Sequence, residues 1–351
     1  FYMPGMGDRV REMLAMESDL REALEKGQLR LLFQPQVSMR TGRVCGAEAL
    51  LRWDHPARGL VLPGEFIPLA EETGLIVAVG KWVVGETCRL ARSLLDKGLE
   101  PICFAVNVSP RQFRQADLVD MIRDALERSG LPPHLLELEV TETLLMTDVE
   151  NAIQKMTQLK DLGVQLAIDD FGSGYSSLSY LKHFPIRKLK VDRGFIKDLN
   201  HDRHDLAIAA SVASLAKVMG LEALAEGVES RDQERALLGL GIEWAQGFLY
   251  EKPLAAEQFE AFLGQSDIQS CEAPGGLVSP DFLPGLEKSE GSGAPLILIA
   301  DPERDFLAPL AVVLRRMGYD VMAVRGPAET LGQARRRRPQ VVILAGSPEG
   351  Q

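Results

Sequence analysis

One stretch of the sequence reads Gln165-Leu166-Ala167-Ile168-Asp169-Asp170-Phe171-Gly172-Ser173-Gly174-Tyr175-Ser176-Ser177-Leu178. It is an apolar run that stops on two adjacent carboxylates and a glycine-rich turn. Leu166 and Ile168 are typical of a strand, and the glycines allow a tight bend before a helix. Two neighbouring acids repel each other unless a cation lies between them, so Asp169 and Asp170 favour a divalent metal ion. The alternative is a polar turn without chemistry.

Short strand-like runs alternate with helical stretches on both sides of this segment. We expect strands at residues 29–37, 44–53, 102–108, 135–141, 164–168, 186–191, 222–225 and 242–245. We expect helices at residues 64–73, 81–97, 117–129, 149–162, 205–219, 231–240 and 255–263. This alternation predicts a parallel sheet, and about eight units in one domain predict a closed α/β barrel of the triosephosphate isomerase type.

The regions that flank this predicted barrel, residues 28–264, have other patterns. Residues 1–27 contain an amphipathic helix, which is either a connector or a helix that pairs with a second copy. Residues 265–293 are rich in Gly, Pro and Ser, and they predict a linker. Residues 294–351 begin a second α/β unit. Its expected strands are 296–299, 319–324 and 341–344, and its expected helices are 303–317 and a second one that ends near residue 338.

Charge and cysteine content narrow the classes of partner and the cellular setting. A net charge of -11 argues against duplex nucleic acid or an anionic membrane as the default partner. Cys45, Cys88, Cys103 and Cys271 form no Cys-x-x-Cys pair, which favours a reducing, cytoplasmic setting over a zinc knuckle or a disulfide framework. The apolar run 75–84 is too short to span a bilayer. Because the sequence begins at Phe1, we expect a piece of a longer protein, in which a membrane anchor can precede it.

Polar residues lie at the ends of nearly all the expected strands, where the active-site loops of such a barrel lie, and Glu48 lies within the second strand. They are Glu48, Asn107, Glu139, Glu142, Asp169, Asp170, Lys190, Asp192, Glu226, Glu229 and Gln246. Oxygen ligands without paired His or Cys favour hard cations such as Mg²⁺ or Mn²⁺. Two such ions that share one carboxylate suit an in-line displacement at phosphorus.

Several of these residues also have a purely structural interpretation. Asn107 could cap a turn, Glu139 could pair with a nearby Arg, and Lys190 could be a solvated strand end. The run 201–205 could bind a metal through its histidines, but its position at a helix start favours a cap. The ring as a whole favours chemistry, because the structural alternative would have to hold independently at each position.

An ordered series of motifs resembles the EAL family of bacterial cyclic-di-GMP phosphodiesterases. Its signature is Glu48-Ala49-Leu50 followed by Arg52, and the resemblance extends from Leu29 to Leu263. The other motifs are Gln34-Pro35, residues 52–56, Asn107-Val108-Ser109, residues 139–142, residues 169–178, Lys190-Val191-Asp192, residues 225–229 and Gln246-Gly247-Phe248. The resemblance implies an α/β barrel whose first strand runs antiparallel to the others. It also implies hydrolysis of cyclic-di-GMP to linear pGpG.

The resemblance further implies a role for each matching residue. One cation would be held by Glu48, Asn107, Glu139 and Asp169, and the other by Asp169, Asp170 and Glu226. The catalytic residues would be Lys190, Glu226, Gln246, Glu142 and Glu229, with Lys190 and Gln246 at the attacking water and Glu142 and Glu229 bracing the loop 171–177. The ligand would contact Gln34, Arg52 and Asp192. Ca²⁺ would inhibit, because a larger ion misplaces the water. The alternative is a receptor that binds cyclic-di-GMP without turnover, although here every ligand position is filled.

The two flanks resemble parts of other signalling domains. Phe1-Tyr2-Met3-Pro4 and the helix after it resemble the exit of a GGDEF domain, which implies upstream GGDEF or sensor domains. Residues 294–351 resemble the first half of a response-regulator receiver. Asp301 stands alone where receivers have paired acids, and Ala345 occupies the phosphoacceptor position, so we do not expect phosphorylation. The resemblance also implies a homodimer through the barrel near residues 169–178.

Overall fold

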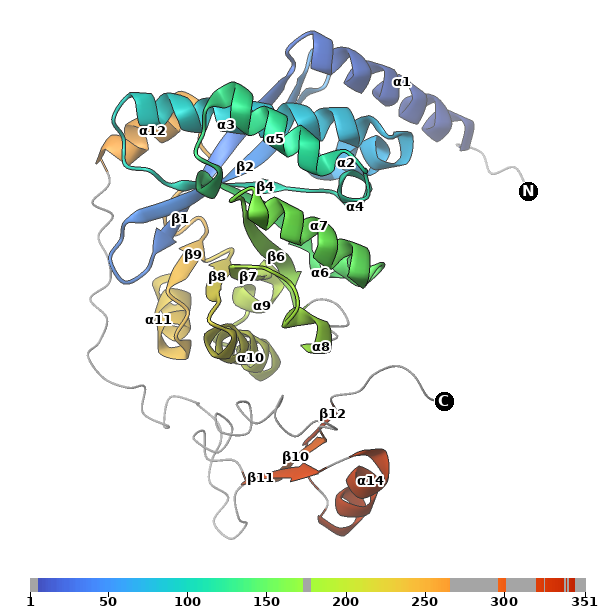
Figure 1. Ribbon diagram of the computed structural model, residues 1–351, viewed down its shortest axis with the longest axis vertical. Helices are drawn as coiled ribbons and strands as arrows, with labels where there is room; N and C mark the ends of the chain where they lie inside the picture. The colour runs from blue at the N-terminus through green and yellow to red at the C-terminus, as the bar shows by residue number, and fades with distance from the viewer. Residues whose placement is uncertain are drawn as a thin grey trace.

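The strands of the main unit form a closed ring with helices outside it (Figure 1). The computed structural model describes residues 6–172, 178–265, 296–300, 320–324, 326–337, 339 and 341–344. The strands of the ring are β1 (Leu29–Ser38), β2 (Val44–His55), β4 (Cys103–Asn107), β5 (Leu136–Thr141), β6 (Gln165–Phe171), β7 (Lys188–Val191), β8 (Glu222–Glu226) and β9 (Trp244–Gln246). Their order is β1-β9-β8-β7-β6-β5-β4-β2, and β1 also pairs with β2.

The direction of β1 confirms the expected barrel variant. β1 pairs antiparallel with both β2 and β9, whereas the other neighbours in the ring pair parallel. The predicted α/β barrel with an antiparallel first strand is therefore confirmed. A short strand, β3 (Gly59–Val61), extends β2 at one edge and was not predicted.

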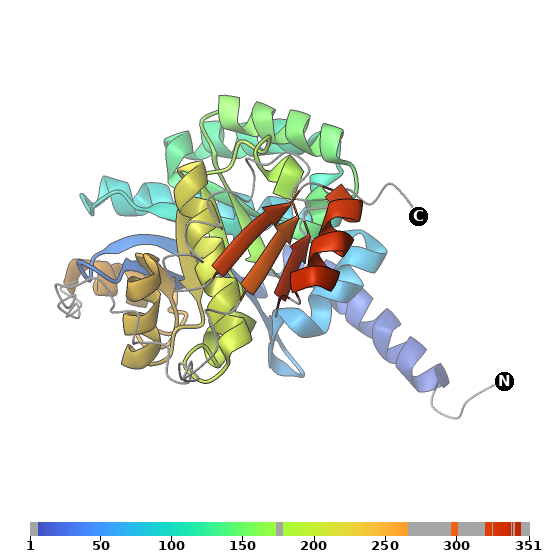
Figure 2. The same cartoon turned by 90° about the horizontal axis from the view of Figure 1, so that it is seen from below.

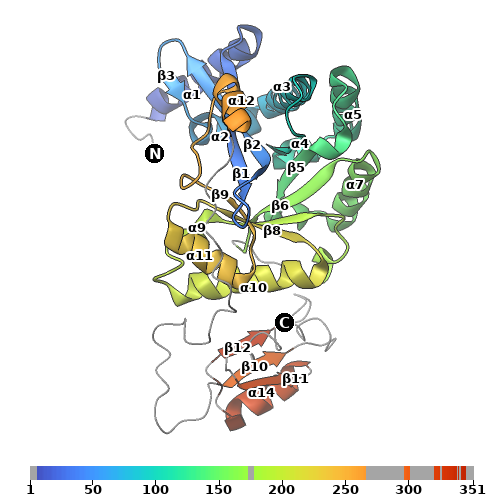
Figure 3. The ribbon, with the colours of Figure 1, turned by 90° about the vertical axis from the view of Figure 1, so that its left-hand side faces the viewer.

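Helices cover the outside of the ring. The longer ones are α2 (Pro63–Thr73), α3 (Leu75–Asp96), α5 (Leu118–Ser129), α7 (Val149–Asp161), α10 (Arg203–Met219), α11 (Arg231–Leu240) and α12 (Ala256–Gln265). Shorter elements are α4 (Pro110–Phe113), the 3₁₀ turn Pro133–Leu135, α6 (Glu142–Leu145), α8 (Leu178–Leu181) and α9 (Arg193–Lys197). The helix α1 (Met6–Glu25) lies against α2 and α3 (Figure 3).

The start of α3 differs from the prediction. The helix begins at Leu75 rather than at residue 81, because Gly80 lies inside it and does not break it. A Cβ at Gly80 would collide with the side chain of Gln112, so the missing side chain lets α4 approach the helix. The apolar run 75–84 supplies the buried face of α3 through Ile76, Val79 and Val83.

The barrel has an apolar outer layer and a polar interior. Residues of a strand alternate between faces. On β5, Leu136, Leu138 and Val140 belong to the apolar core, whereas Glu137 and Glu139 are buried among polar groups. The polar residues buried in the strands include Gln34, Gln36, Glu48, Glu137, Glu139, Asp169, Lys188, Lys190 and Gln246. Ionisable side chains are rarely buried without partners, so we expect the buried acids and lysines of this interior to contact one another.

The C-terminal segment forms a small sheet of its own. Strand β10 (Leu296–Ala300) lies between β11 (Asp320–Val324) and β12 (Val341–Leu344), with all pairs parallel. Helix α14 (Gly326–Arg337) packs against β10 (Figure 2). Residues 266–293 of the predicted linker, the helix expected at 303–317, Asp301 and Ala345 lie outside the described residues, whereas Gln265 ends α12. The likeness to a receiver stays a prediction.

A helix needs about 20 predominantly apolar residues to cross a lipid bilayer. Within the described parts of the chain, no helix combines the length and the apolar character needed to cross a membrane.

Candidate active site

The ammonium group of Lys190 lies at the centre of the predicted ring of acids. Lys190 is on β7, and its side chain is fully buried. Its Nζ lies 2.6 Å from Glu226 Oε1, 2.7 Å from Glu139 Oε2 and 3.2 Å from Asp169 Oδ1. Glu48 Oε2 is 3.8 Å away. Four strands thus bring carboxylates to one cation, and the interpretation of Lys190 as a solvated strand end is wrong.

A bulge in β6 brings Asp169 and Asp170 to the same site. Ile168 pairs with Leu189 and Phe171 pairs with Val191, so both aspartates lie opposite the single residue Lys190. Asp170 has a φ of 54°, a left-handed conformation that Asp tolerates better than most residues. In a regular strand, adjacent side chains point to opposite faces. Because of the bulge, carboxylate oxygens of Asp169, Asp170 and Glu226 lie within 4.8 Å of one another.

Amide side chains hold Glu48 on the other side of the ring. Asn107 Nδ2 donates to Glu48 Oε1 at 2.6 Å, and Gln246 Nε2 donates to Glu48 Oε2 at 2.5 Å. Gln246 Nε2 also donates to Gln34 Oε1 at 3.1 Å. Gln34 and Glu48 are direct partners in the β1–β2 register. Strands β1, β2, β4 and β9 therefore contribute to the site together with β5 to β8.

Burial and crowding of like charges shift the pKa values in this ring. Burial, together with Glu48 and Asp169, raises the pKa of Glu139 well above its ordinary value, although Lys190 opposes this. Burial and neighbouring acids likewise raise the pKa of Glu226 to about 8 and that of Asp170 to about 6. Burial alone would lower the pKa of Lys190, but the carboxylates outweigh it and raise this pKa well above its usual value. Lys190 therefore stays protonated, and its single positive charge does not balance the carboxylates around it.

The donor set suits a hard divalent cation. Glu139 Oε1 and Gln246 Oε1 are buried and have no hydrogen-bond partner in the described part of the chain. The clustered oxygens of Asp169, Asp170 and Glu226 are of the kind that binds Mg²⁺ or Mn²⁺. A buried acceptor without a donor is unfavourable, and a cation would satisfy it.

The other predicted site residues surround this cluster. Glu142 Oε2 accepts a hydrogen bond from the Gly172 amide at 3.4 Å, next to the predicted loop. Glu229 is exposed, with its backbone amide donating to Gln233 Oε1, and loop residues 173–177 lie outside the described residues. Its bracing role and the predicted homodimer near 169–178 therefore stay predictions.

Arg52 and Asp192 lie at the margin of the site. Arg52 is half-buried on β2, four residues beyond Glu48 on the same face of the strand. Its Nη1 donates to the Leu51 carbonyl at 2.8 Å. Asp192 caps α9 by accepting a hydrogen bond from the Gly194 amide at 2.7 Å, and it interacts with Asp170 and raises its pKa.

The structure also decides the remaining alternatives. Glu139 pairs with a lysine and not with an arginine. The cap of α4 is Ser109, which accepts from the Gln112 amide, whereas Asn107 donates into the site. Asp202 caps α10 by accepting from the His204 amide, and both histidines of this run are exposed, so the cap interpretation is confirmed.

Three polar residues inside the barrel were missed by the sequence analysis. Lys188 Nζ lies 2.6 Å from Glu137 Oε1 and donates to Gln36 Oε1 at 3.2 Å. Each of the three lies two residues from a predicted site residue, on the same face of its strand. That spacing was the available signal, because Lys188, Glu137 and Gln36 repeat the chemistry of Lys190, Glu139 and Gln34.

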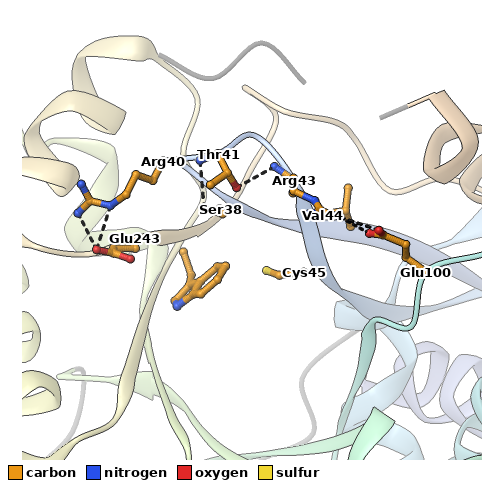
Figure 4. Close-up of a pocket in the computed structure, with 9 residues that line it drawn as sticks. Ser38, Arg40, Thr41, Arg43, Val44, Cys45, Glu100 and Glu243 are labelled. Atoms are coloured by element: carbon orange, nitrogen blue, oxygen red, sulfur yellow. Dashed lines mark hydrogen bonds and ion pairs between the residues drawn. The ribbon is translucent and has the colours of Figure 1, made fainter. Parts of the chain in front are cut away.

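A separate cavity of about 360 Å³ lies at the opposite end of the barrel, near the end of β1 and the starts of β2 and β9 (Figure 4). Arg40 pairs with Glu243 on one side of it, and Arg43 pairs with Glu100 on the other. Both arginines are neutralised by exposed glutamates. The carboxylate excess is thus found at the carboxyl ends of the strands, where barrel enzymes carry their chemistry.

Comparison with known proteins identifies a family and several relatives. The family profile described as the EAL domain matches residues 17–253. The chain is 48% identical over 261 residues to the bifunctional diguanylate cyclase/cyclic di-GMP phosphodiesterase MucR of Pseudomonas aeruginosa, covering 74% of this chain and 38% of that protein. It is 44% identical over 255 residues to the cyclic di-GMP phosphodiesterase NbdA of the same organism, covering 73% and 33%. The chain thus spans less than two-fifths of the length of these two relatives.

Solved structures give the same result. A MucR phosphodiesterase in complex with c-di-GMP matches with a TM-score of 0.68 and 49% identity, over 70% of this chain and 99% of that chain. The FimX EAL domain from Pseudomonas aeruginosa bound to c-di-GMP matches with a TM-score of 0.63 and 27% identity, over 69% and 96%. From the match over residues 17–253 and from these relatives, the chain belongs to the EAL domain family.

Proposed function

We propose that this chain hydrolyses cyclic-di-GMP to linear pGpG with two divalent cations, Mg²⁺ or Mn²⁺. The observation that carries the proposal is the charge imbalance around Lys190. The carboxylates gathered there belong to Glu48, Glu139, Asp169, Asp170 and Glu226. Five carboxylates against one ammonium leave four formal negative charges, which two divalent cations would neutralise. The names of the relatives support cyclic-di-GMP as the substrate.

The ligands divide into two sets that share one residue. Glu48, Asn107, Glu139 and Asp169 would hold one ion, and Asp169, Asp170 and Glu226 would hold the other. The bulge in β6 is what makes this sharing feasible, because it turns both aspartates toward Glu226. When bound, the two cations would lower the pKa of the attacking water and offset charge that develops on the phosphate.

The remaining residues would bind and orient the reactants. Lys190 keeps its proton, so its ammonium can hold the oxygen of the attacking water while it also contacts Glu139 and Glu226. Gln246, fixed by Glu48 and Gln34, presents its amide to the same space. Arg52 would pair with a phosphate of the cyclic dinucleotide, and Gln34 and Asp192 would contact the ligand beside it.

The competing function is a receptor that binds cyclic-di-GMP and leaves it intact. The complete set of oxygen ligands favours hydrolysis. The test is to incubate the chain with cyclic-di-GMP and Mn²⁺ and to follow the nucleotides by chromatography, with EDTA as the control. We expect pGpG in the Mn²⁺ sample alone, and Ca²⁺ should not replace Mn²⁺. Tight binding of cyclic-di-GMP that stays intact would refute the enzyme proposal and support the receptor.

A further inference from the structure

Lys188 and Glu137 form an ion pair inside the barrel, on the amino-terminal side of the proposed metal site, and the proposed mechanism does not use them. Lys188 Nζ lies 2.6 Å from Glu137 Oε1, and their side chains are 8% and 2% exposed. We call this pair the lower bridge. Glu137 is on β5 and Lys188 is on β7, with β6 between them. The lower bridge therefore joins two strands that do not hydrogen-bond to each other.

A second ion pair joins the same two strands two residues further on. Lys190 Nζ lies 2.7 Å from Glu139 Oε2, and we call this pair the upper bridge. Residues two apart on a strand share a face and lie about 6.6 Å apart along it. Each bridge therefore uses equivalent positions of β5 and β7, and only the upper one includes a proposed metal ligand, Glu139.

Strand β6, which lies between β5 and β7, leaves room for the lower bridge. Ala167 on β6 is in register with Glu139 on one side and with Lys188 on the other. Its methyl group is small, so it leaves room for the long side chain of Lys188 to reach Glu137. Gln36 of β1 accepts a second hydrogen bond from Lys188 at 3.2 Å, which ties the lower bridge to the far wall of the barrel.

We propose that the lower bridge positions Glu139 for metal binding, with Lys190 beside it, by fixing the separation of β5 and β7. The inference rests on the proposed function, because its effect is on the metal site. Desolvation of two charges offsets much of their attraction, so stability alone is a weak reason for a buried ion pair. A bridge of fixed length holds the ligands next to it at a fixed spacing, and metal affinity depends steeply on such supporting contacts.

The test measures Mn²⁺ binding to the complete chain, 1–351, by the electron paramagnetic resonance signal of free Mn²⁺. The double variant Lys188→Met/Glu137→Leu replaces both charges with apolar side chains of similar volume, a change that buried ion pairs commonly tolerate. We expect it to fold, but to bind Mn²⁺ about 10–100-fold more weakly than the unmodified chain. Mn²⁺ binding with unchanged affinity in the folded double variant would overturn the proposal.

A second variant and a matched control make the result unambiguous. Glu137→Gln/Lys188→Gln keeps polar groups in the barrel but shortens the side chain on β7, so it loses the span across β6. It should show a loss of Mn²⁺ affinity as well, and unchanged affinity here would also overturn the proposal. The control is Arg187→Gln/Glu222→Gln, which removes a half-exposed ion pair between β8 and the residue before β7. The Mn²⁺ affinity of this control should not change. A loss of affinity as large as that of Lys188→Met/Glu137→Leu would contradict a specific role for the lower bridge.

Failure of the proposed function would look different. If the unmodified chain binds no Mn²⁺, both the proposed function and this inference are overturned. The unmodified chain could instead bind two Mn²⁺ ions and produce pGpG. If the two variants of the lower bridge then bind Mn²⁺ as tightly as the unmodified chain, only the positioning role is wrong. If the lower bridge contributes only to stability, its removal would lower the melting temperature. The Mn²⁺ affinity of the folded protein would then stay unchanged.

Discussion

The two buried lysines of β7 lie two residues apart but have different surroundings. Lys188 meets one carboxylate, Glu137, and one amide oxygen, so its charge is balanced. Lys190 meets carboxylates from four strands, and negative charge is in excess around it. In a balanced buried pair the two charges neutralise each other, and no further ion is needed. An unbalanced group requires a further cation, so the charge count separates a supporting contact from a reactive site.

We call the groups around Lys190 the Lys190 layer and the groups around Lys188 the Lys188 layer. The two layers also differ in which buried polar atoms lack a hydrogen-bond partner. Near Lys190, Glu139 Oε1 and Gln246 Oε1 are acceptors without donors among the described residues. Near Lys188, the unpartnered buried atom in the described part is Gln36 Nε2, which is a donor. A metal ion can satisfy acceptors but not donors. The comparison therefore predicts cation binding in the Lys190 layer only.

The largest effect is expected from Glu48→Ala. This change removes one carboxylate from the Lys190 layer and leaves Asn107 and Gln246 without their shared acceptor. Loss of one group that stabilises the transition state lowers kcat by about 10²–10³-fold. Hydrolysis of cyclic-di-GMP with saturating Mn²⁺ measures it. Glu100→Ala is the matched control, because Glu100 pairs with Arg43 at the opposite end of the barrel. Near-normal turnover in Glu48→Ala would refute the metal-ligand assignment.

The next largest effect is on stability, from breaking the lower bridge on one side. Lys188→Met leaves Glu137 buried without its cation, which should cost about 3–5 kcal/mol of the free energy of unfolding. Adding Glu137→Leu removes the unpaired charge, so most of that loss should be recovered. Urea unfolding with EDTA present measures both variants. Equal stability of the single and double variants would show that the pair is not coupled.

In both layers stability should fall as pH rises, but in different pH ranges. Burial and nearby acids raise the pKa of Glu226 to about 8 and that of Asp170 to about 6. Without metal, these groups keep protons that the unfolded chain has released above about pH 4. Stability should therefore fall as pH rises from about 5 to about 8. Saturating Mn²⁺ binds the ionised forms and should remove this fall.

The loss expected from Lys188 lies in a higher pH range. Burial opposes its charge, but Glu137 outweighs burial and raises its pKa. Its stabilising contribution is complete below about pH 10, the pKa of an unfolded lysine, and is lost only above that. Melting temperatures between pH 5 and 9, with EDTA and with Mn²⁺, separate the two layers. A melting temperature that rises through pH 6–8 in EDTA would contradict the assignment of the raised pKa values.

Residues of the site could be predicted from the sequence where a local signal exists. Asp169 and Asp170 end an apolar run, and Glu139 and Lys190 also follow strand-like segments, so their placement at one end of a barrel follows from the fold class. Their mutual contacts could not be predicted in this way. Strand alternation places Asp169 and Asp170 on opposite faces, and only the bulge opposite Lys190 brings them together.

The lower bridge shows a second limit. Glu137 and Lys188 are 51 residues apart, and their contact depends on the packing of β5 and β7 around β6. Neither residue matches a motif, so the resemblance to the EAL family gave no signal for them. The start of α3 was missed for a similar reason, because the close approach of Gln112 that requires a residue without a side chain at position 80 exists only in the folded barrel. Local patterns identify elements and strand ends, whereas contacts across the barrel require the closed fold.

The smallest effect is expected from Arg187→Gln, which calibrates the comparison of the two layers. Arg187 Nη2 lies 2.8 Å from Glu222 Oε1, close to the 2.6 Å of the lower bridge, but the side chains are 51% and 30% exposed. Solvent screens such a pair, so its removal should cost about 0.2–1 kcal/mol and the cost should shrink further in high salt. Urea unfolding at low and high salt measures this. A loss as large as that of Lys188→Met would mean that burial does not set the strength of these pairs, and the contrast between the balanced and the unbalanced lysine would lose its physical basis.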